Sequence, residues 1–335
     1  MLHHVFCTLW GLWCSHVPHH TTDTSYLAYQ EVQVLIDQAA GEGLYTRHEL
    51  IDLFAHAQHQ DDVLHAMQAP AESLDWGQYR NIFVTPERLH AGLKFWNQHA
   101  DSLQRAEQIY GVPAPIILAI LGVETHYGER QGRFRVIDSL STLAFDYPPR
   151  ARYFRGELLH FLELCHSQHL DPATTLGSYA GAMGYGQFMP SSWLTQAVDF
   201  DGDGRIDLIH NADDALGSIA HYLQTNGWKP GPVAEPARIT GQNYDLHLDT
   251  RLQITSTLGQ LSQQGIFATS PSLPDTTAAS VLRLQGAHGG EFWIAYPNFY
   301  VITRYNHSSL YAMAVWQLSQ ALAAAHEHGP IAPKQ

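Results

Sequence analysis

The amino-acid sequence predicts an α+β fold in which helices predominate. Over most of the 335 residues, apolar side chains recur at every third or fourth position, which is the spacing of helices that bury one face. Proline and glycine residues stand at the ends of these runs, where helices begin and end. Between residues 231 and 308 the sequence changes to Pro, Thr, Gln and short alternating runs, which predicts a small β-containing region late in the chain.

The composition is that of a folded protein with a substantial core. Hydrophobic residues make up 45% and charged residues 15%, and the length predicts two or three packed sub-domains. The formal charge of -14, with only 18 Lys and Arg, excludes nucleic acid as a partner because phosphate binding needs a basic face. Affinity for an anionic polymer would have to come from hydrogen bonds and stacking, for which 16 Tyr and 8 Trp are available.

The first 24 residues are interpreted as a remnant signal or leader segment. The stretch from Met1 to Val17 is apolar and contains Trp10 and Trp13, but it lacks a basic start and an A-x-A cleavage site. It is too short, and too often interrupted by His, to span a bilayer. The three cysteines, Cys7, Cys14 and Cys165, form neither a disulfide framework nor a metal-binding spacing.

The first predicted unit is a helical domain over residues 25–110. Apolar residues between Tyr26 and about Gln68 fit two helices that are separated by glycines. A third helix begins with Thr85 as its N-cap and Pro86 as its first residue, and it runs toward Tyr110. Residues 214–230 and a C-terminal helix over 309–326 are expected to complete this domain.

The second predicted unit, residues 111–213, begins with a very apolar helix, and the third is the β-containing region 231–308. The apolar helix runs from Ile116 to about Tyr127 and ends at Gly128. The remaining predicted elements are a helix after Pro148-Pro149, a helix from about Asp214 to Asn226, a helix from Ser309 to about His326, and strands over Phe292–Tyr296 and Phe299–Arg304.

A single carboxylate lies in the last turn of the apolar helix. Burial among apolar neighbours and the negative end of the helix dipole are both expected to raise the pKa of Glu124. A carboxyl group that keeps its proton near neutral pH can protonate a glycosidic oxygen. A structural Glu paired with an Arg, or capping a loop, would give the same local pattern. The neighbouring His126 is interpreted as a packing or supporting residue.

A glycine-rich block follows at residues 177–192. Its four glycines within ten residues allow the backbone to approach a ligand closely. Ser178, Tyr179, Tyr185 and Gln187 add polar groups suited to sugar hydroxyls and N-acetyl amides. The block is not a phosphate loop, because no Lys-Ser/Thr follows it. A close-packed turn would explain the glycines but not the density of Tyr and Gln.

An acidic loop begins at residue 199 and matches the start of an EF-hand loop. Asp199, Asp201 and Asp203 occupy positions one, three and five, and Arg205 offers a backbone carbonyl at position seven. Position twelve is His210, where an EF-hand has Glu, so the ordinary pattern is broken. The alternatives are a structural calcium site and a solvated acidic turn.

These segments together resemble the membrane-bound lytic murein transglycosylase B family, glycoside hydrolase family 103. The matching residues include Gly122-Val123-Glu124-Thr125, the run from Gly181 to Ser192, Gln78-Tyr79-Arg80, and the run from Asn298 to Ser308. The resemblance covers roughly residues 26–325, in order. The sequence departs from the family at Pro149, where a second Arg is usual, and at His126-Tyr127, where Arg-Trp is usual.

The resemblance implies a lysozyme-like catalytic core flanked by a helical domain and a small β domain. It implies that Glu124 is the catalytic residue. It also implies that Asp214 at the start of the next helix, or its neighbour Asp213, closes a longer calcium loop spanning 199–214. Roles in a substrate groove are implied for Tyr79, Arg150, Tyr153, Ser178, Gln187, Met189, Tyr222, Tyr305, Asn306 and Tyr311.

The absence of an obvious second catalytic carboxylate favours one reaction. A glycoside hydrolase of the usual type needs two carboxylates, and Glu129, Asp138 and Asp146 are candidates by proximity only. A lytic transglycosylase needs one, because the C6 hydroxyl of MurNAc is the nucleophile and a 1,6-anhydro sugar is the product. The alternatives are a muramidase that releases reducing ends and a catalytically silent wall-binding protein.

The resemblance implies peptidoglycan glycan strands as the binding partner. It implies a location in the periplasm or at the outer membrane of a Gram-negative bacterium, and it raises membrane anchoring and the cell-wall synthesis machinery as further partners. Calcium is the one cofactor expected.

Overall fold

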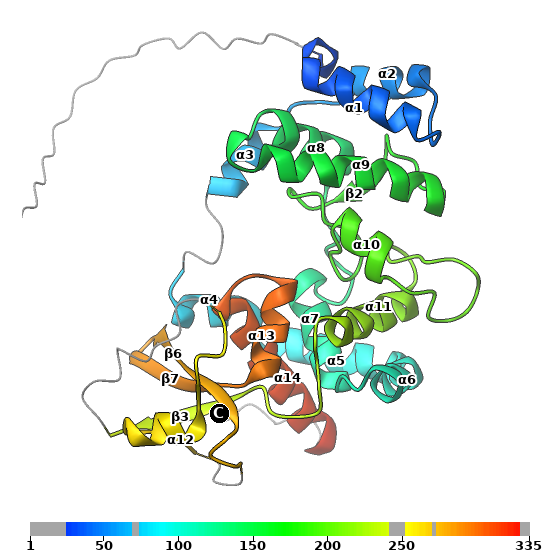
Figure 1. Cartoon of the computed structure of the whole chain (residues 1–335). Coiled ribbons are helices and arrows are strands. Elements are labelled where there is room, and N and C mark those ends of the chain that lie inside the picture. The colour runs from blue at the N-terminus through cyan, green and yellow to red at the C-terminus, as the bar shows by residue number, and fades with distance from the viewer. Residues whose placement is uncertain (1–24, 69–73, 241–251, 270–272, 329–335) are drawn as a thin grey trace, which may run out of the picture.

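The computed structural model describes residues 25–68, 74–240, 252–269 and 273–328. These residues form two groups of helices and a curved sheet that lies against the second group (Figure 1). The predicted leader, residues 1–24, lies outside the described residues. Among the described residues no single helix is long and apolar enough to cross a membrane. Ala100–Tyr110 and Ala114–Thr125, which meet at an angle of 115°, are long and apolar enough only when they are counted together.

The first group of helices lies in the upper part of Figure 1. Its long helix α9 packs on α8 and on the N-terminal helix α1. A capping box starts α2, in which Thr46 and Glu49 bond to each other's backbone N–H groups. The elements of this group are η1 (Tyr26–Ala28), α1 (Gln30–Gly41), α2 (Arg47–Ala55), α3 (Asp61–Gln68), α8 (Val136–Phe145), η3 (Pro148–Arg150) and α9 (Ala151–Gln168).

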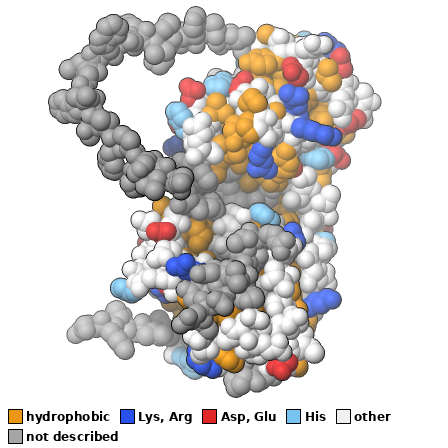
Figure 2. Space-filling view, turned by 60° about the vertical axis from the view of Figure 1, so that its left-hand side comes forward, with side chains coloured by type: hydrophobic (Ala, Val, Ile, Leu, Met, Phe, Trp, Pro, Cys, Tyr) orange, Lys and Arg blue, Asp and Glu red, His pale blue; other side chains and the backbone are white. Residues whose placement is uncertain are grey.

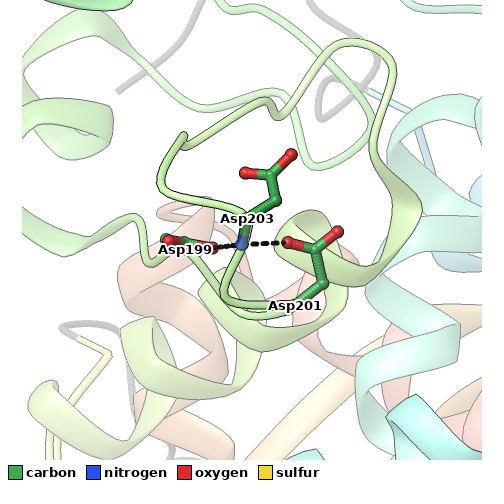
Figure 3. A group of neighbouring side chains, drawn as sticks. All are labelled: Asp199, Asp201 and Asp203. Carbon is green, nitrogen blue, oxygen red and sulfur yellow. Dashed lines mark hydrogen bonds between the residues drawn. The ribbon is translucent and has the colours of Figure 1, made fainter.

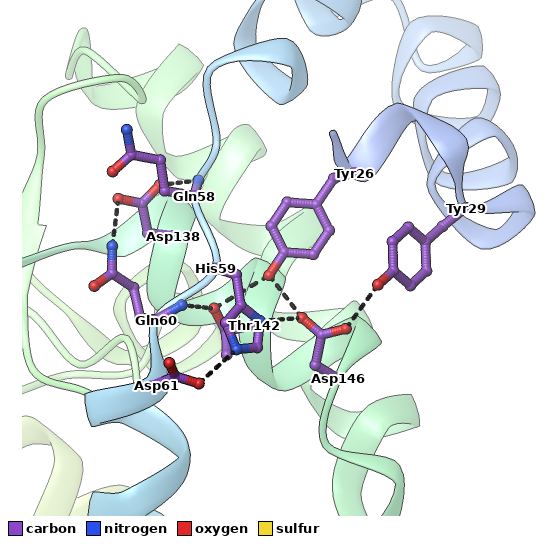
Figure 4. A network of polar contacts seen from close by, with 9 residues as sticks. All are labelled: Tyr26, Tyr29, Gln58, His59, Gln60, Asp61, Asp138, Thr142 and Asp146. Carbon is purple, nitrogen blue, oxygen red and sulfur yellow. Dashed lines mark hydrogen bonds and ion pairs between the residues drawn. The ribbon is translucent and has the colours of Figure 1, made fainter. Parts of the chain in front are cut away.

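A partly buried polar network ties the N-terminal helices of this group to α8 (Figure 4). The carboxylate of Asp146, which follows α8, accepts hydrogen bonds from the hydroxyls of Tyr26 at 2.9 Å and Tyr29 at 3.1 Å. His59 lies between two acids, with Nδ1 2.7 Å from Asp146 and Nε2 3.1 Å from Asp61. Burial alone would lower the pKa of His59, but the hydrogen bonds and charges of Asp146 and Asp61 together raise it.

The raised pKa of His59 predicts a pH-dependent contribution to stability. A histidine whose folded pKa exceeds its unfolded value stabilises the fold fully below the unfolded pKa, and this stabilisation is lost as the pH rises through the folded pKa. Replacing His59 with Gln should therefore lower the melting temperature more at about pH 5.5 than at about pH 8.5, by a difference on the order of 2 °C. Thermal melts at both pH values measure this. His56→Gln, which changes an exposed histidine beside Asp52, is the matched control and should show no such difference.

Helix α7 lies at the centre of the second group of helices. Helix α7 packs against α14, α11, α5 and α6. The elements of this group are α4 (Trp76–Phe83), α5 (Pro86–Gln98), α6 (Ala100–Tyr110), α7 (Ala114–Thr125), α11 (Ala212–Thr225), α13 (Pro297–Tyr305) and α14 (Ser309–His328). Residues 25–110, which the sequence groups together, are thus shared between the two groups of helices.

Two predicted elements in this second group are wrong. The helix predicted from Thr85 to Tyr110 is interrupted at His99, whose φ of -122° and ψ of 28° are not helical, although Thr85 caps its start as predicted. The strand predicted over Phe299–Arg304 lies inside helix α13. Pro297 stands in the first turn of α13, and every residue from Asn298 to Thr303 is buried. The run is apolar because it is buried all round, and periodicity cannot separate such a helix from a buried strand.

The β region is a five-stranded antiparallel sheet in the order β4-β6-β7-β3-β5. The predicted strand Phe292–Tyr296 is confirmed, within one residue, as part of β7. The sequence reading missed its hairpin partner β6, which pairs Gly286 with Gly289 at the turn. The elements are β3 (Ala234–Ile239), β4 (Ser256–Thr257), α12 (Leu258–Gln263), β5 (Ile266–Ala268), β6 (Ala278–Gly286) and β7 (Gly289–Ala295).

The glycine-rich block joins the two groups of helices. A short ladder pairs β1 (Phe134–Arg135) with β2 (Leu176–Gly177), and α10 (Pro190–Gln196) follows the block and packs on α9 and α11. Figure 1 shows this segment between the upper and lower helices, above α7 and α11. The block is therefore held where the end of α7 meets the upper helices.

Candidate active site

Glu124 is the penultimate residue of α7 and is partly exposed, whereas Val123 and Thr125 on either side are buried. The helix ends at once, because His126 and Tyr127 both adopt left-handed φ values, of 54° and 61°. Thr125 fixes this end, since its hydroxyl donates to the carbonyl of Tyr185 at 2.7 Å and accepts from the N–H of Gly128 at 2.9 Å. The end of α7 is thus bonded to the glycine-rich block.

Tyr311 on α14 holds the Glu124 carboxylate. Its hydroxyl donates to Oε1 of Glu124 at 2.6 Å, and the residue is only 2% exposed. Burial, followed by the charge of Glu124, raises the pKa of Tyr311 well above its usual range. The phenol therefore stays a donor at any physiological pH and fixes the orientation of the carboxyl group.

Three further aromatic side chains continue from Tyr311 along one row. The ring of Tyr305 lies nearly parallel to that of Tyr311, with centroids 6.5 Å apart, and Tyr222 meets Tyr305 at 4.8 Å. Phe188 packs edge-on against both Tyr222 and Tyr305. Two hydroxyls of the row are anchored to backbone carbonyls, Tyr305 to Gly186 and Tyr222 to Arg304, both at 2.7 Å. Within this row Phe188 and Tyr311 are buried, whereas Tyr222 and Tyr305 are partly exposed.

The glycine-rich block is held by its own polar side chains. The hydroxyl oxygen of Ser178 accepts hydrogen bonds from the N–H groups of Ala180 and Ala182 at 3.2 and 3.1 Å. Gln187 has a left-handed φ of 50°, and its amide nitrogen donates to the carbonyls of Gln131 at 3.0 Å and Gly184 at 2.9 Å. A side chain at Gly184 would place its Cβ 2.3 Å from the carbonyl oxygen of Leu208, so only glycine fits there.

The remaining predicted groove residues occupy three places. Tyr79, on α4, is 1% exposed, packs on Phe83 and lies near Tyr311. Met189 is the residue that precedes α10. Asn306 follows α13 and is partly exposed. Tyr79 and Tyr311 are too deeply buried to present a ring face to a ligand. They pack beneath the surface, where Tyr311 holds Glu124.

Arg150 and Tyr153 lie at the start of α9, and Tyr153 is near enough to Tyr222 of the aromatic row to interact with it electrostatically. The guanidinium of Arg150 lies 4.5 Å above the ring of Tyr153, and both residues line a pocket of about 620 Å³ with Arg152 and His160. The buried carboxylate of Glu157 joins this wall to α10 by accepting from the hydroxyl and the N–H of Ser191. In the space-filling view, Lys and Arg side chains are visible on the upper helices (Figure 2).

The three acids that the sequence placed near Glu124 are engaged elsewhere. Glu129 is exposed and faces His126 at 3.1 Å. Asp138 is 2% exposed and pairs with Arg135 at 2.8 Å. Asp146 accepts the tyrosine and histidine bonds of the network described above. Thr125, Phe188 and Glu157 were not predicted as site residues, because each acts through a contact with a distant part of the chain.

The acidic loop brings three carboxylates together (Figure 3). Asp199, Asp201 and Asp203 each offer an oxygen, and these oxygens all lie within 4.8 Å of one another. The loop is shaped by its own bonds, since Asp199 accepts from the N–H groups of Gly202 and Gly204, both at 2.8 Å. Oxygen ligands in such a cluster are the ones that calcium prefers. The donor set therefore fits a hard divalent cation.

Asp214 and Asp213 take different positions beside this loop. Asp214 is fully buried, and its carboxylate accepts hydrogen bonds from the N–H groups of Phe200 at 2.7 Å and Asp207 at 2.8 Å. Asp213 is about one third exposed and faces Nδ1 of His99 at 3.4 Å. Arg205 is exposed, and its N–H donates to Asp203. The Asp214 carboxylate therefore joins residue 200 to residue 207 by hydrogen bonds, and it is not one of the three clustered carboxylates.

Known proteins are similar to this chain in sequence and in structure. The family described as "Transglycosylase SLT domain" matches residues 28–320. The chain is 43% identical over 303 residues to the membrane-bound lytic murein transglycosylase B of Escherichia coli (strain K12), which covers 88% of this chain and 82% of that relative.

Two solved structures extend this similarity. The Escherichia coli lytic transglycosylase Slt35 in complex with calcium matches with a TM-score of 0.82 and 44% identity, over 89% of this chain and 94% of that chain. SltB3 from Pseudomonas aeruginosa, in complex with NAG-anhNAM-pentapeptide, matches with a TM-score of 0.77 and 31% identity, over 92% of this chain and 81% of that chain.

Proposed function

This chain belongs to the transglycosylase SLT family, and on that premise we propose that Glu124 is the single acid/base of a lytic transglycosylase that cleaves peptidoglycan. The bond cleaved is the β-1,4 bond between MurNAc and GlcNAc, and the expected product is a strand that ends in 1,6-anhydro-MurNAc. The observation that carries this proposal is the lone carboxylate at the end of α7, oriented by Tyr311 at 2.6 Å.

The reaction proceeds in two proton transfers through one residue. Glu124 gives its proton to the glycosidic oxygen as the bond from that oxygen to C1 of MurNAc breaks. The N-acetyl carbonyl of the same sugar stabilises the positive charge at C1. Glu124, now a carboxylate, removes the proton from the C6 hydroxyl, and the C6 oxygen bonds to C1. The nucleophile belongs to the substrate, so no water has to be positioned and no second carboxylate is needed.

Other residues around the site bind and align the strand. Ser178, Gln187 and Met189 contribute from the glycine-rich block, and Tyr222 and Tyr305 contribute ring faces from the aromatic row. Asn306 contributes a polar side chain next to that row. Tyr79 and Tyr311 act by supporting the row and Glu124, because both are buried. Arg150 and Tyr153 bind another part of the substrate in the pocket at the start of α9.

The mass of the released product tests the reaction directly. Digestion of purified sacculi should release disaccharide-peptides that are one water lighter than the hydrolysed form, because the anhydro bond forms without water. Mass spectrometry of the soluble products measures this. A product with the mass of the reducing sugar would instead establish a muramidase, and the absence of any soluble product would point to a wall-binding protein.

We also propose that the acidic loop binds one structural calcium ion. Asp199, Asp201 and Asp203 supply carboxylate oxygens, and the backbone carbonyl of Arg205 supplies another ligand. A cation would relieve the mutual repulsion of carboxylates held this close together. The calcium complex of Slt35 supports the proposal. Asp214 was predicted to close the site as a ligand, and its bonds to Phe200 and Asp207 favour a role in bracing the loop.

Removing calcium should lower the stability of the protein, because the proposed ion is structural and takes no part in the cleavage reaction. Addition of EDTA should lower the melting temperature by several degrees, since a bound ligand stabilises by mass action. Return of calcium should restore the original value, and magnesium should restore less because it demands a stricter geometry. Differential scanning calorimetry measures the shift. An unchanged melting temperature in EDTA would leave the loop as a solvated acidic turn.

A wall-degrading role places the protein outside the cytoplasm. The similarity to a membrane-bound relative supports a location in the periplasm or at the outer membrane of a Gram-negative cell. Peptidoglycan strands are the proposed partner, and the complex of SltB3 with NAG-anhNAM-pentapeptide supports that choice. Membrane anchoring and contact with the cell-wall synthesis machinery remain proposals that co-fractionation and co-purification would test.

A further inference from the structure

A pocket of about 840 Å³ lies between the five-stranded sheet and the second group of helices, away from Glu124. Its volume is within the range of sites that bind small molecules or a few sugar units. The pocket is lined by residues of α4, β3, β7 and α14, together with Val84, Pro232, Thr269 and Leu273. Its polar and aromatic lining residues include Arg80, Glu235, Glu291, Trp293, Trp316 and Gln317.

This pocket is separate from the catalytic groove although it shares two helices with it. Trp316 follows Tyr311 by five residues on α14, which turns the side chain by about 140° around the helix. Arg80 is the neighbour of Tyr79 on α4 and is exposed, whereas Tyr79 is buried toward Tyr311. The helices that support Glu124 on one side thus form a pocket wall on the other.

The polar groups of the pocket are held in place before any ligand binds. Nε of Arg80 donates to Oε1 of Gln317 at 2.6 Å, and the indole N–H of Trp76 donates to Glu291 at 3.2 Å. Glu235 is fixed by the hydroxyls of Tyr296 and Thr269. Planar polar side chains held in this way can pair with adjacent hydroxyls of a sugar at little entropic cost.

Two half-buried indole rings, Trp293 and Trp316, supply apolar faces in the same pocket. Such faces pack against the C–H face of a pyranose ring. The indole N–H of Trp293 is itself buried and has no acceptor among the described residues. Rings beside fixed polar groups suit a ligand that has both an apolar face and many oxygen acceptors.

The charge of the pocket narrows the choice of ligand. Two carboxylates, Glu235 and Glu291, and one guanidinium, Arg80, line the pocket, and the whole chain carries a formal charge of -14. An anionic ligand, such as a peptide stem rich in carboxylates, would be repelled. An uncharged N-acetylated amino sugar would not. We propose that this pocket is a second, non-catalytic glycan site that binds uncharged N-acetylglucosamine units of the strand.

A second glycan site would keep the enzyme on a long strand between cuts. Release of one product from the catalytic groove would leave the polymer held at the pocket, and rebinding would be intramolecular. The gain should therefore appear on intact sacculi and not on short soluble fragments. This inference takes the kind of polymer from the proposed function, but its binding test does not depend on catalysis.

Calorimetric titration with the uncharged N-acetylglucosamine tetramer tests the site. In a Glu124→Gln background, adding Trp316→Ala should lower the number of tetramers bound per protein by one, or weaken that binding event at least tenfold. Trp316→Phe should retain it because the ring face remains. The matched control is Trp96→Ala. Trp96 belongs to α5 and stacks outside the pocket on His326, which lies on α14 as Trp316 does. Unchanged binding in the Trp316→Ala variant would overturn the proposal.

Two further measurements keep the test decisive. Gln317→Ala removes a polar lining group without disturbing the core, and it should weaken the same binding event if Trp316→Ala fails to fold. With Glu124 intact, Trp316→Ala should raise the KM for sacculi severalfold and leave kcat on short soluble glycans unchanged. Loss of wall lysis with unchanged tetramer binding would overturn the second site alone. Tetramer binding lost with Trp316 while Glu124→Gln still lysed walls would overturn the proposed catalytic residue alone.

Discussion

Replacing Glu124 with Gln should reduce the rate of anhydro-sugar formation by roughly a thousandfold or more. The amide has nearly the same shape and can still accept the hydrogen bond from Tyr311, so the fold should be kept. It has no acidic proton to give to the glycosidic oxygen, and it cannot take the proton of the C6 hydroxyl. Turbidity loss of sacculi and quantification of anhydro products measure the effect.

Glu129→Gln is the matched control for this substitution. Glu129 lies five residues further along the chain, is exposed and faces His126. Its replacement should leave the rate within about twofold of the original, because it is neither buried nor bonded to the aromatic row. Full wall-lytic activity in the Glu124→Gln variant would remove the basis of the proposed mechanism. Equal losses in both variants would mean that a pair of carboxylates is at work.

Replacing Asp214 with Ala should destabilise the protein by about 3 kcal/mol or more. The side chain is fully buried, and its removal leaves the N–H groups of Phe200 and Asp207 without their acceptor. The loop that presents Asp199, Asp201 and Asp203 would lose its brace, so calcium affinity should fall as well. Urea unfolding in calcium and in EDTA measures both quantities.

Asp213→Ala separates this role from that of the adjacent acid. Asp213 is about one third exposed and has only a long contact to His99, so its loss should cost no more than about 0.5 kcal/mol. If Asp213→Ala instead lowered calcium affinity more than Asp214→Ala did, Asp213 would be the ligand that closes the loop. A small effect in both variants would argue against any bracing role for the segment.

The sequence predicted those parts of the site whose pattern is local. Glu124 stands alone on a helix of continuous apolar residues, and the glycine-rich block combines residues that a simple turn would not need. Both signals lie within a few residues, so they can be read without knowing the fold. The capping of α5 by Thr85 was predicted for the same reason.

The parts that depend on distant contacts could not be predicted in this way. The hydrogen bond between Tyr311 and Glu124 joins positions 187 residues apart, and the local sequence around either residue does not predict it. The burial of α13 on all sides gives the same run of apolar residues as a buried strand. Asp214 has the sequence context of a metal ligand, but its two backbone partners become visible only when the loop closes over it.

The distance in sequence between Glu124 and Tyr311 also sets the order in which activity can arise. Contacts of such long separation form late, because the loop between them must close first. A chain that is still being synthesised has α7 and the glycine-rich block long before it has α14. Such a chain lacks the phenol that orients its acid. We therefore expect the proposed active site to be complete only after α14 has been synthesised and has packed on α7.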